Sequence, residues 1–366
     1  MASWAGSEIL GERTYVSANV FGMLVVFGVT LVAAFLATPV AERVCWRFGL
    51  IDKPRPGELQ MRPAARAGGY AIIFAFLVGL VVSRAFFQWQ GYDLTRLIAL
   101  LAGLVLLVPL ALADDVKRLG PGVQLVGQVG IAALPVAFGL LIDTVANPFG
   151  GVLPLPMIVA VPFTLIWIVG MINTMNWIDT MDGLVAGVTA IAALVLFVRS
   201  VMLGQYSLAV LPLLLAAGCL GFLPFNFSPA RVFAGSGGSY FIGYALAVLA
   251  VIGGAKIATA LLALGLPIFD VAVVIVRRVL AGRSPFKGGD NAHLVHRLAR
   301  RGLSTRRIAL IFYAFSMLTS SLAFLLSGPI KLYLFSIIGV VFVTGVLLFA
   351  MRTRRDIENG VTQPRA

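Results

Sequence analysis

The sequence predicts an all-α integral membrane protein with about eleven transmembrane helices, an N-terminus outside the cell and a cytoplasmic C-terminus. The first observation is composition. The 366 residues are 60% hydrophobic and only 12% charged, with a mean hydropathy of +0.99, which is too apolar for a soluble domain of this length. The second is the recurrence of apolar segments near the roughly 20 residues that a helix needs to cross a bilayer. The third is an uneven distribution of basic residues.

The apolar segments follow one another along nearly the whole chain, and the eighth is the shortest. They comprise residues 20–41, 69–87, 97–113, 123–142, 152–172, 183–203, 207–224, 239–252, 256–276, 307–326 and 330–351. They leave no room for a separate soluble domain, and no internal repeat is visible, so we expect one polytopic membrane domain over residues 1–366. The first eighteen residues carry neither a basic leader nor a cleavage motif, so no removable signal peptide is expected.

The orientation follows from Lys and Arg, which concentrate in the cytoplasmic loops of membrane proteins. If the N-terminus is outside, 22 of the 28 Lys and Arg residues fall on the inner side, many of them in a basic cytoplasmic loop at 277–306. The net charge of +13 is therefore mostly a topology signal. It would also attract the headgroups of membrane lipids and phosphorylated substrates, and no nucleic-acid partner is expected. Cys45 and Cys219 indicate neither a disulfide framework nor a metal site.

With this topology, the unusual polar residues fall on the inner side. Two carboxylates end the third span, four Asn and Asp residues lie between the fifth and sixth spans, and both histidines lie in the basic loop. The segment FAGSGGSY (233–240) is predicted as a turn before the eighth span, where glycines let the backbone approach a neighbouring group closely. The polar residues are Asp114, Asp115, Asn173, Asn176, Asp179, Asp182, His293 and His296. Their position on one membrane face is what a single assembled site requires.

The four residues between the fifth and sixth spans are three positions apart. On an α-helix this spacing drifts by about 60° per step, whereas a 3₁₀ turn or a broken helix end would align the side chains. Aligned near Asp114 and Asp115, their oxygens would suit Mg²⁺ or Mn²⁺ together with phosphate.

Each of these residues also has a purely structural explanation. Asp114 could pair with Lys117 or Arg118 at a helix end, Asp182 could stabilise the N-terminus of the sixth span, and the two histidines could lie on a solvated helix face. The coincidence of all of them on one membrane face favours a functional site. Asp270, inside the ninth span, could be an ion site but is interpreted as a helix–helix contact without a catalytic role.

Four segments of the sequence resemble the successive signatures of a known enzyme family. They are LADDVKRLGPGVQLVGQ, NTMNWIDTMDGLVAG, FNFSPARVFAGSGGSYFIG and SPFKGGDNAHLVHRL, and the similarity begins earlier, at GLIDKPRPGELQMRPAARAGGY. The family is that of the polyprenyl-phosphate N-acetylhexosamine-1-phosphate transferases (glycosyltransferase family 4). The histidine segment resembles the bacterial undecaprenyl-phosphate N-acetylglucosamine-1-phosphate branch more than the peptidoglycan translocase branch. The resemblance covers most of the chain and implies eleven spans with an outside N-terminus.

The resemblance implies an enzyme that transfers a sugar-1-phosphate from a UDP-sugar to polyprenyl phosphate and releases UMP. This is the first membrane step of a cell-envelope glycan pathway, with Mg²⁺ or Mn²⁺ as cofactor, at the cytoplasmic face of the bacterial plasma membrane. By resemblance, the catalytic residues are Asp114 and Asp115, and the metal ligands are Asn176, Asp179 and the degenerate position Ser236. The uridine would be bound by Asp182, Gly183 and Leu184. The sugar diphosphate would be bound by Arg66, His293, His296 and Arg297.

The sequence departs from the family pattern at four places near the polar site. Ser236 stands where the family has its metal-binding aspartate, Thr180 replaces a glycine, Val295 replaces a histidine, and residues 57–60 replace an Arg-Lys-x-His motif. An active transferase is the first hypothesis, and a non-catalytic or weakly active relative that binds lipid phosphate or nucleotide-sugar is the alternative. A transporter ranks third, because its charged groups would lie near the bilayer midplane. The donor sugar stays open, as does the choice between a monomer and a homodimer.

Overall fold

The structure, a computed structural model, is a bundle of helices. It describes residues 2–54, 62–147, 149–252, 257–280, 282, 284, 293–326 and 328–358, so the altered motif at 57–60 lies outside the described residues. The helices are α1 (Ala2–Phe48), α2 (Tyr70–Ser83), α3 (Gly91–Lys117), α4 (Pro121–Ala137), α5 (Met157–Ile178), α6 (Leu184–Met202), α7 (Tyr206–Asn226), α8 (Gly235–Ile252), α9 (Ile257–Ala263), α10 (Gly265–Leu280), α11 (Leu294–Arg300), α12 (Thr305–Leu325) and α13 (Gly328–Glu358).

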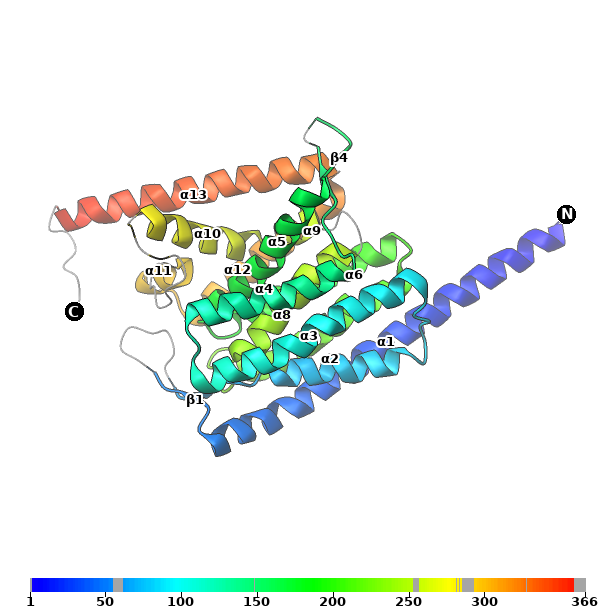
Figure 1. Cartoon of the computed structure of the whole chain (residues 1–366), viewed down its shortest axis with the longest axis horizontal. Coiled ribbons are helices and arrows are strands. Elements are labelled where there is room, and N and C mark those ends of the chain that lie inside the picture. Colours follow the sequence, from blue (N-terminus) through cyan, green and yellow to red (C-terminus); the bar gives the residue numbers. More distant parts are fainter. Residues whose placement is uncertain are drawn as a thin grey trace.

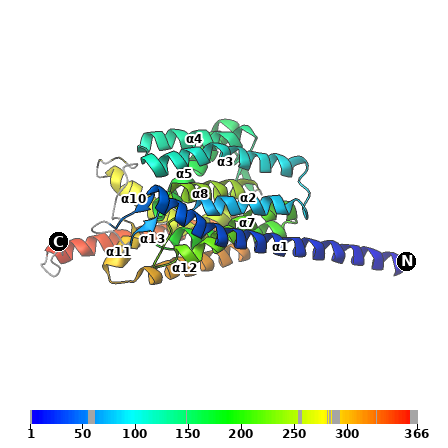
Figure 2. The ribbon, with the colours of Figure 1, turned by 90° about the horizontal axis from the view of Figure 1, so that it is seen from below.

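Most of the long helices run roughly along one axis, with the start of α1 and the end of α13 at opposite ends of the molecule (Figure 1). Seen from the second direction, α3 and α4 lie along one side and α12 along the other, with α8 between them (Figure 2). Helix α8 packs against α2, α3, α5, α6 and α7, and nearly all its side chains are buried. The first turn of α8 therefore lies where several helix ends meet.

Each predicted apolar segment contains helical structure, although the fifth begins in a strand at residues 152–154. Among the described residues, seven helices are long and apolar enough to cross a membrane, which agrees with a multi-pass membrane protein. Helices α2 and α4 and the apolar part of α13 (Pro329–Gly345) are shorter. The exact number of spans and their orientation stay predictions.

The ninth predicted segment is not one continuous helix. Helices α9 and α10 are bent by 80° about Leu264. Pro267 explains the break, because its ring removes an N–H donor and clashes with the carbonyl four residues earlier, at Ala263. A proline in the first turn of α10 is tolerated, since the first N–H groups of a helix have no intrahelical partner.

Two short strand pairs complete the fold. Strand β1 (Ile51–Asp52) pairs antiparallel with β2 (Ala64–Ala65), and β3 (Thr144–Ala146) pairs with β4 (Val152–Pro154). Ala65 also bridges to Val232, just before α8. This bridge aligns the start of α2 with the start of α8.

Candidate active site

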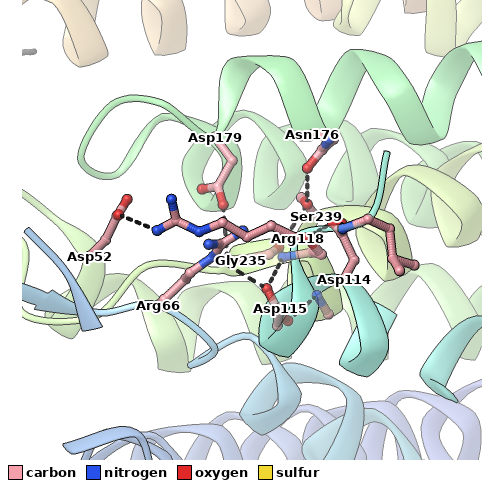
Figure 3. Close-up of polar contacts among 12 residues, drawn as sticks. Asp52, Arg66, Asp114, Asp115, Arg118, Asn176, Asp179, Gly235 and Ser239 are labelled. Atoms are coloured by element: carbon pink, nitrogen blue, oxygen red, sulfur yellow. Dashed lines mark hydrogen bonds and ion pairs between the residues drawn. The ribbon is translucent and has the colours of Figure 1, made fainter. Parts of the chain in front are cut away.

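The predicted turn at 233–240 is helical from Gly235 onward, because α8 begins four residues earlier than the sequence indicated. The first N–H groups of a helix need acceptors from elsewhere, and two carboxylates supply them (Figure 3). Asp179 Oδ2 accepts from Gly235 N at 2.9 Å. Asp115 accepts from Ser236 N at 2.9 Å and from Gly237 N at 3.0 Å. Negative charge at this end of α8 also interacts favourably with the helix dipole.

The glycines of this segment approach the chain's own backbone. Gly235 has φ +63°, and a Cβ there would lie 2.2 Å from the carbonyl oxygen of Arg66. A Cβ at Gly238 would lie 2.8 Å from the Cα of Gly69, at the start of α2. The close approach that the sequence predicted therefore serves the packing of α2 against α8.

Asp114 is held by uncharged donors. Its Oδ1 accepts from Leu119 N at 2.9 Å and from Gln124 Nε2 at 2.8 Å. Its Oδ2 accepts from the hydroxyls of Ser236, at 2.5 Å, and Tyr240, at 3.2 Å. Arg118, one of its predicted ion-pair partners, pairs instead with Asp52 at 3.6 Å (Figure 3).

The polar side chains near the end of α5 contact different neighbours. The helix is α-helical through Ile178, so Asn173 and Asn176 lie on an α-helix and not in a 3₁₀ turn, whereas Asp179 and Asp182 follow its end. Asn173 donates to Gln128 Oε1 at 2.6 Å, on α4. Asn176 Oδ1 accepts from the Ser239 hydroxyl at 3.1 Å, on the first turns of α8.

The two carboxylate oxygens of Asp179, the C-cap residue of α5, differ in their hydrogen bonding. Oδ2 accepts from Gly235 N, whereas Oδ1 is buried without a hydrogen-bond partner in the part of the chain that the structure describes. Burial raises the pKa of Asp179 well above its usual range, the Gly235 N–H opposes that shift, and the charge of Asp115 adds to it. An unmatched carboxylate oxygen in this position fits a cation or a donor from a substrate.

The structure thus brings four predicted residues, Asp114, Asp115, Asn176 and Asp179, to the first turns of α8. Arg66 joins them, with Nε 3.7 Å from Asp115 Oδ1. The sequence interpretation missed the neutral partners of these residues. Tyr70, Gln124 and Tyr240 donate to Asp115 or Asp114, and Ser239 donates to Asn176. Tyr240 and Ser239 belong to the quoted α8 segment, so their side chains were visible as candidates, but nothing local showed which acid they would contact.

The predicted uridine-binding residues lie in the turn after α5. Asp182 Oδ2 accepts from Ala230 N at 3.0 Å. Asp182 makes no side-chain cap on α6, because Gly183, with φ +74°, is the N-cap residue of that helix. The Gly183 carbonyl accepts from the Tyr313 hydroxyl at 2.5 Å, and Leu184 is buried. This turn is therefore fixed to the segment before α8 and to α12.

The two histidines and Arg297 are buried at the start of α11, so the alternative of a solvated helix face is wrong. His293 Nδ1 lies 2.8 Å from Asp270 Oδ2. Arg297 Nη2 is buried without a hydrogen-bond partner among the described residues. Arg66, predicted to bind the sugar diphosphate together with these residues, has an ion pair with Asp115.

The side chains of the acid cluster fit a metal ion that takes most of its ligands from a substrate. All four carboxylate oxygens of Asp114 and Asp115 already accept hydrogen bonds, and Asp179 Oδ1 does not. Within the described residues, no three His, Cys, Asp or Glu side chains are grouped as a metal site. Mg²⁺ usually binds through one or two carboxylates, with water and phosphate completing its shell.

Comparison with known proteins decides the family. A probable undecaprenyl-phosphate N-acetylglucosaminyl 1-phosphate transferase of Bacillus subtilis (strain 168) is 34% identical over 322 residues, which are 86% of this chain and 88% of that protein. The chain belongs to glycosyl transferase family 4. The model of this family matches residues 97–254, a range that includes the acid cluster except Arg66. This family 4 member is therefore a membrane transferase.

Two further relatives show how far the similarity extends. The decaprenyl-phosphate N-acetylglucosaminephosphotransferase of Mycobacterium tuberculosis (strain ATCC 25618 / H37Rv) is 33% identical over 317 residues, 77% of each chain. The undecaprenyl-phosphate alpha-N-acetylglucosaminyl 1-phosphate transferase of Thermotoga maritima (strain ATCC 43589 / DSM 3109 / JCM 10099 / NBRC 100826 / MSB8) is 33% identical over 159 residues, 43% of this chain and 48% of that protein.

Proposed function

We propose that this family 4 transferase moves a sugar-1-phosphate, an N-acetylhexosamine-1-phosphate, from a UDP-sugar to polyprenyl phosphate. The observation that carries the proposal is the convergence of Asp114, Asp115, Asn176 and Asp179 on the first turns of α8. These oxygens come from α3 and from the end of α5. They meet at α8 in a chain whose named relatives act on polyprenyl phosphates.

In the proposed reaction, an oxygen of the lipid phosphate forms a bond to the β-phosphorus of the UDP-sugar. The bond between that phosphorus and the oxygen that bridges to the α-phosphate breaks, and UMP leaves. The product is a lipid-linked sugar diphosphate. Catalysis of such a transfer depends mostly on positioning and on the stabilisation of negative charge.

Each group of residues has its own part in this proposed reaction. Asp114 and Asp115 act at the lipid phosphate, and Asp114 holds the hydroxyls of Ser236 and Tyr240 in fixed directions. Arg66, held by Asp115, supplies positive charge toward the sugar diphosphate. His293, His296 and Arg297 bind the sugar diphosphate, and the turn with Asp182, Gly183 and Leu184 binds the uridine. Asp179 and Asn176 would hold Mg²⁺ or Mn²⁺, which when bound offsets the charge between the diphosphate and the attacking phosphate.

UMP release tests this function directly. Purified protein with polyprenyl phosphate and a panel of UDP-sugars should release UMP in a manner that depends on both substrates. The signal should be confined to one or a few N-acetylhexosamine donors, which also identifies the sugar. Lack of UMP release with every donor, from folded protein that still binds a UDP-sugar, would contradict catalysis.

That last outcome would favour the second candidate, a weakly active or non-catalytic relative that binds lipid phosphate or nucleotide-sugar. Ser236 supports this candidate. Its hydroxyl donates to Asp114 in the place where the family pattern has a metal-binding carboxylate, and a hydroxyl is a weaker Mg²⁺ ligand than a carboxylate.

We further propose eleven spans, an N-terminus outside and an active site at the cytoplasmic face of the bacterial plasma membrane. The start of α1 and the end of α13 lie at opposite ends of the bundle (Figure 1), which supports an odd number of spans. Single cysteines placed in the 88–95 connection should react with an impermeant thiol reagent in intact cells. Single cysteines at 285–300 should react only after permeabilisation. Reaction of the second loop in intact cells, or failure of the first, would contradict the orientation.

A further inference from the structure

Asp270 is a buried carboxylate to which the proposed reaction assigns no role. It lies on α10, just after the bend from α9, with an exposed fraction of 4%. A carboxylate in such an apolar helix is costly to bury unless its oxygens accept hydrogen bonds. The partners of Asp270 therefore indicate why the residue is there.

Both oxygens of Asp270 bind the start of α11. Oδ1 accepts from Leu294 N at 2.6 Å, and Oδ2 lies 2.8 Å from His293 Nδ1. His293 is the N-cap residue of α11, whose own side chain makes no capping hydrogen bond. One carboxylate from another helix thus satisfies an N–H group at the entrance of α11 and holds the adjacent imidazole.

This contact determines which ring nitrogen of His293 carries a proton. An ionised carboxylate can accept a hydrogen bond but cannot donate one, so its partner Nδ1 must be protonated. Nε2 is then the nitrogen left to meet another group. A carboxylate acts on a histidine in the same way in metal sites and in Ser-His-Asp triads.

Helix α10 also contacts α5, the helix that carries Asn176 of the acid cluster. The Arg278 guanidinium lies 6.0 Å from the ring centre of Trp177, the residue that follows Asn176 on α5. Arg297 N donates to the His293 carbonyl, which places Arg297 one turn along α11. The buried Arg297 Nη2, which lacks a partner among the described residues, is a donor suited to a phosphate or sugar oxygen.

We infer that Asp270 is a positioning residue of the transferase: it holds the His293 imidazole protonated at Nδ1, so that Nε2 and Arg297 together meet the sugar diphosphate. The substrate part of this inference rests on the proposed function. The protonation of Nδ1 does not, because it follows from the contact between His293 and an ionised Asp270.

The histidine content of the chain makes the first test direct. There are only two histidines, so ¹⁵N-histidine labelling yields two imidazole spin systems, and the His296→Gln variant assigns them. Above the ordinary titration range of histidine, at about pH 8.5, His293 should show a proton bonded to Nδ1. A bare Nδ1 in the wild-type protein would overturn the inference, whatever any variant does.

The Asp270→Asn variant supplies the second test. Its carbonyl oxygen can still accept from Leu294 N, but its NH₂ group would donate to His293 Nδ1 and move the ring proton to Nε2. We expect kcat/KM for UMP release to fall roughly 10–100-fold, as for other residues that orient a functional histidine. The matched control is Asp93→Asn. Asp93 pairs with Arg96 at the end of α3 opposite to Asp114 and Asp115, so this variant should leave kcat/KM unchanged.

A double variant separates positioning from a structural role. If Asp270 acts through His293, Asp270→Asn should cause no further loss when His293 is already alanine. An additive loss, or an unchanged His293 spectrum in Asp270→Asn, would overturn the inference. If Asp270→Asn does not fold, the wild-type spectrum still decides. Failure of the wild-type protein to release UMP would count against the proposed function alone, because the spectrum requires no turnover.

Discussion

Ser236→Asp is expected to raise the Mg²⁺-dependent release of UMP by at least about tenfold, which corresponds to about 1.4 kcal/mol of activation free energy. Ser236 is 4% exposed, and its hydroxyl and N–H group contact Asp114 and Asp115. A carboxylate in this place would add an anionic metal ligand within reach of the spare oxygen of Asp179. Mg²⁺ would then no longer depend on substrate phosphates for most of its binding.

The same substitution should make stability depend on Mg²⁺. Without the ion, a third carboxylate beside Asp114 and Asp115 brings like charges together and lowers the thermal unfolding temperature. With Mg²⁺ at 100 times its Kd, binding should restore about 2.7 kcal/mol of unfolding free energy. The wild-type protein should gain much less from the same Mg²⁺ concentration in the absence of substrate.

Ser236→Asn is the matched control, because asparagine has the shape of aspartate without its charge. It should give neither the rate increase nor the stabilisation by Mg²⁺. Rapid turnover by the wild-type protein that Ser236→Asp leaves unchanged would show that another residue holds the metal. An inactive Ser236→Asp protein that gains Mg²⁺ binding would indicate that the other departures from the family pattern limit the reaction.

Asp179→Asn is expected to reduce UMP release by at least about 100-fold, or about 2.7 kcal/mol. The asparagine carbonyl can still accept from Gly235 N, so the first turn of α8 keeps this acceptor. What disappears is the buried Oδ1 that has no partner among the described residues. If that oxygen is a metal ligand, the variant should also lose any stabilisation of the protein by Mg²⁺ in the presence of UDP-sugar.

Stability without ligands should move in the opposite direction. The charge of Asp179 is buried and lies near that of Asp115, as the raised pKa of Asp179 indicates, so its removal should leave the unfolding temperature unchanged or higher. A marked fall in unfolding temperature would instead assign Asp179 to the packing of α5 against α8. Asp93→Asn again serves as the control that should change neither activity nor stability.

Local sequence was sufficient to predict the helices and the residues that make up the site. Hydropathy over about twenty residues is a local property, so every predicted apolar segment contains helical structure. The motifs likewise identified the acids that meet at α8. The bend between α9 and α10 was missed, although Pro267 provided a local signal for it.

The tertiary structure decided which groups contact one another. Ser236 and Asp115 are 121 residues apart in the sequence, Gly235 and Asp179 are 56 apart, and His293 and Asp270 are 23 apart. Each carboxylate could have served several donors, and no periodicity in the sequence distinguishes among them. The choice follows from helix packing, because a buried N–H group or imidazole must find its acceptor among whichever oxygens the neighbouring helices place within about 3 Å. The sequence alone was sufficient to assign Asp179 to this site. The missing hydrogen-bond partner of its Oδ1 among the described residues is instead a result of the packing of α5 against α8.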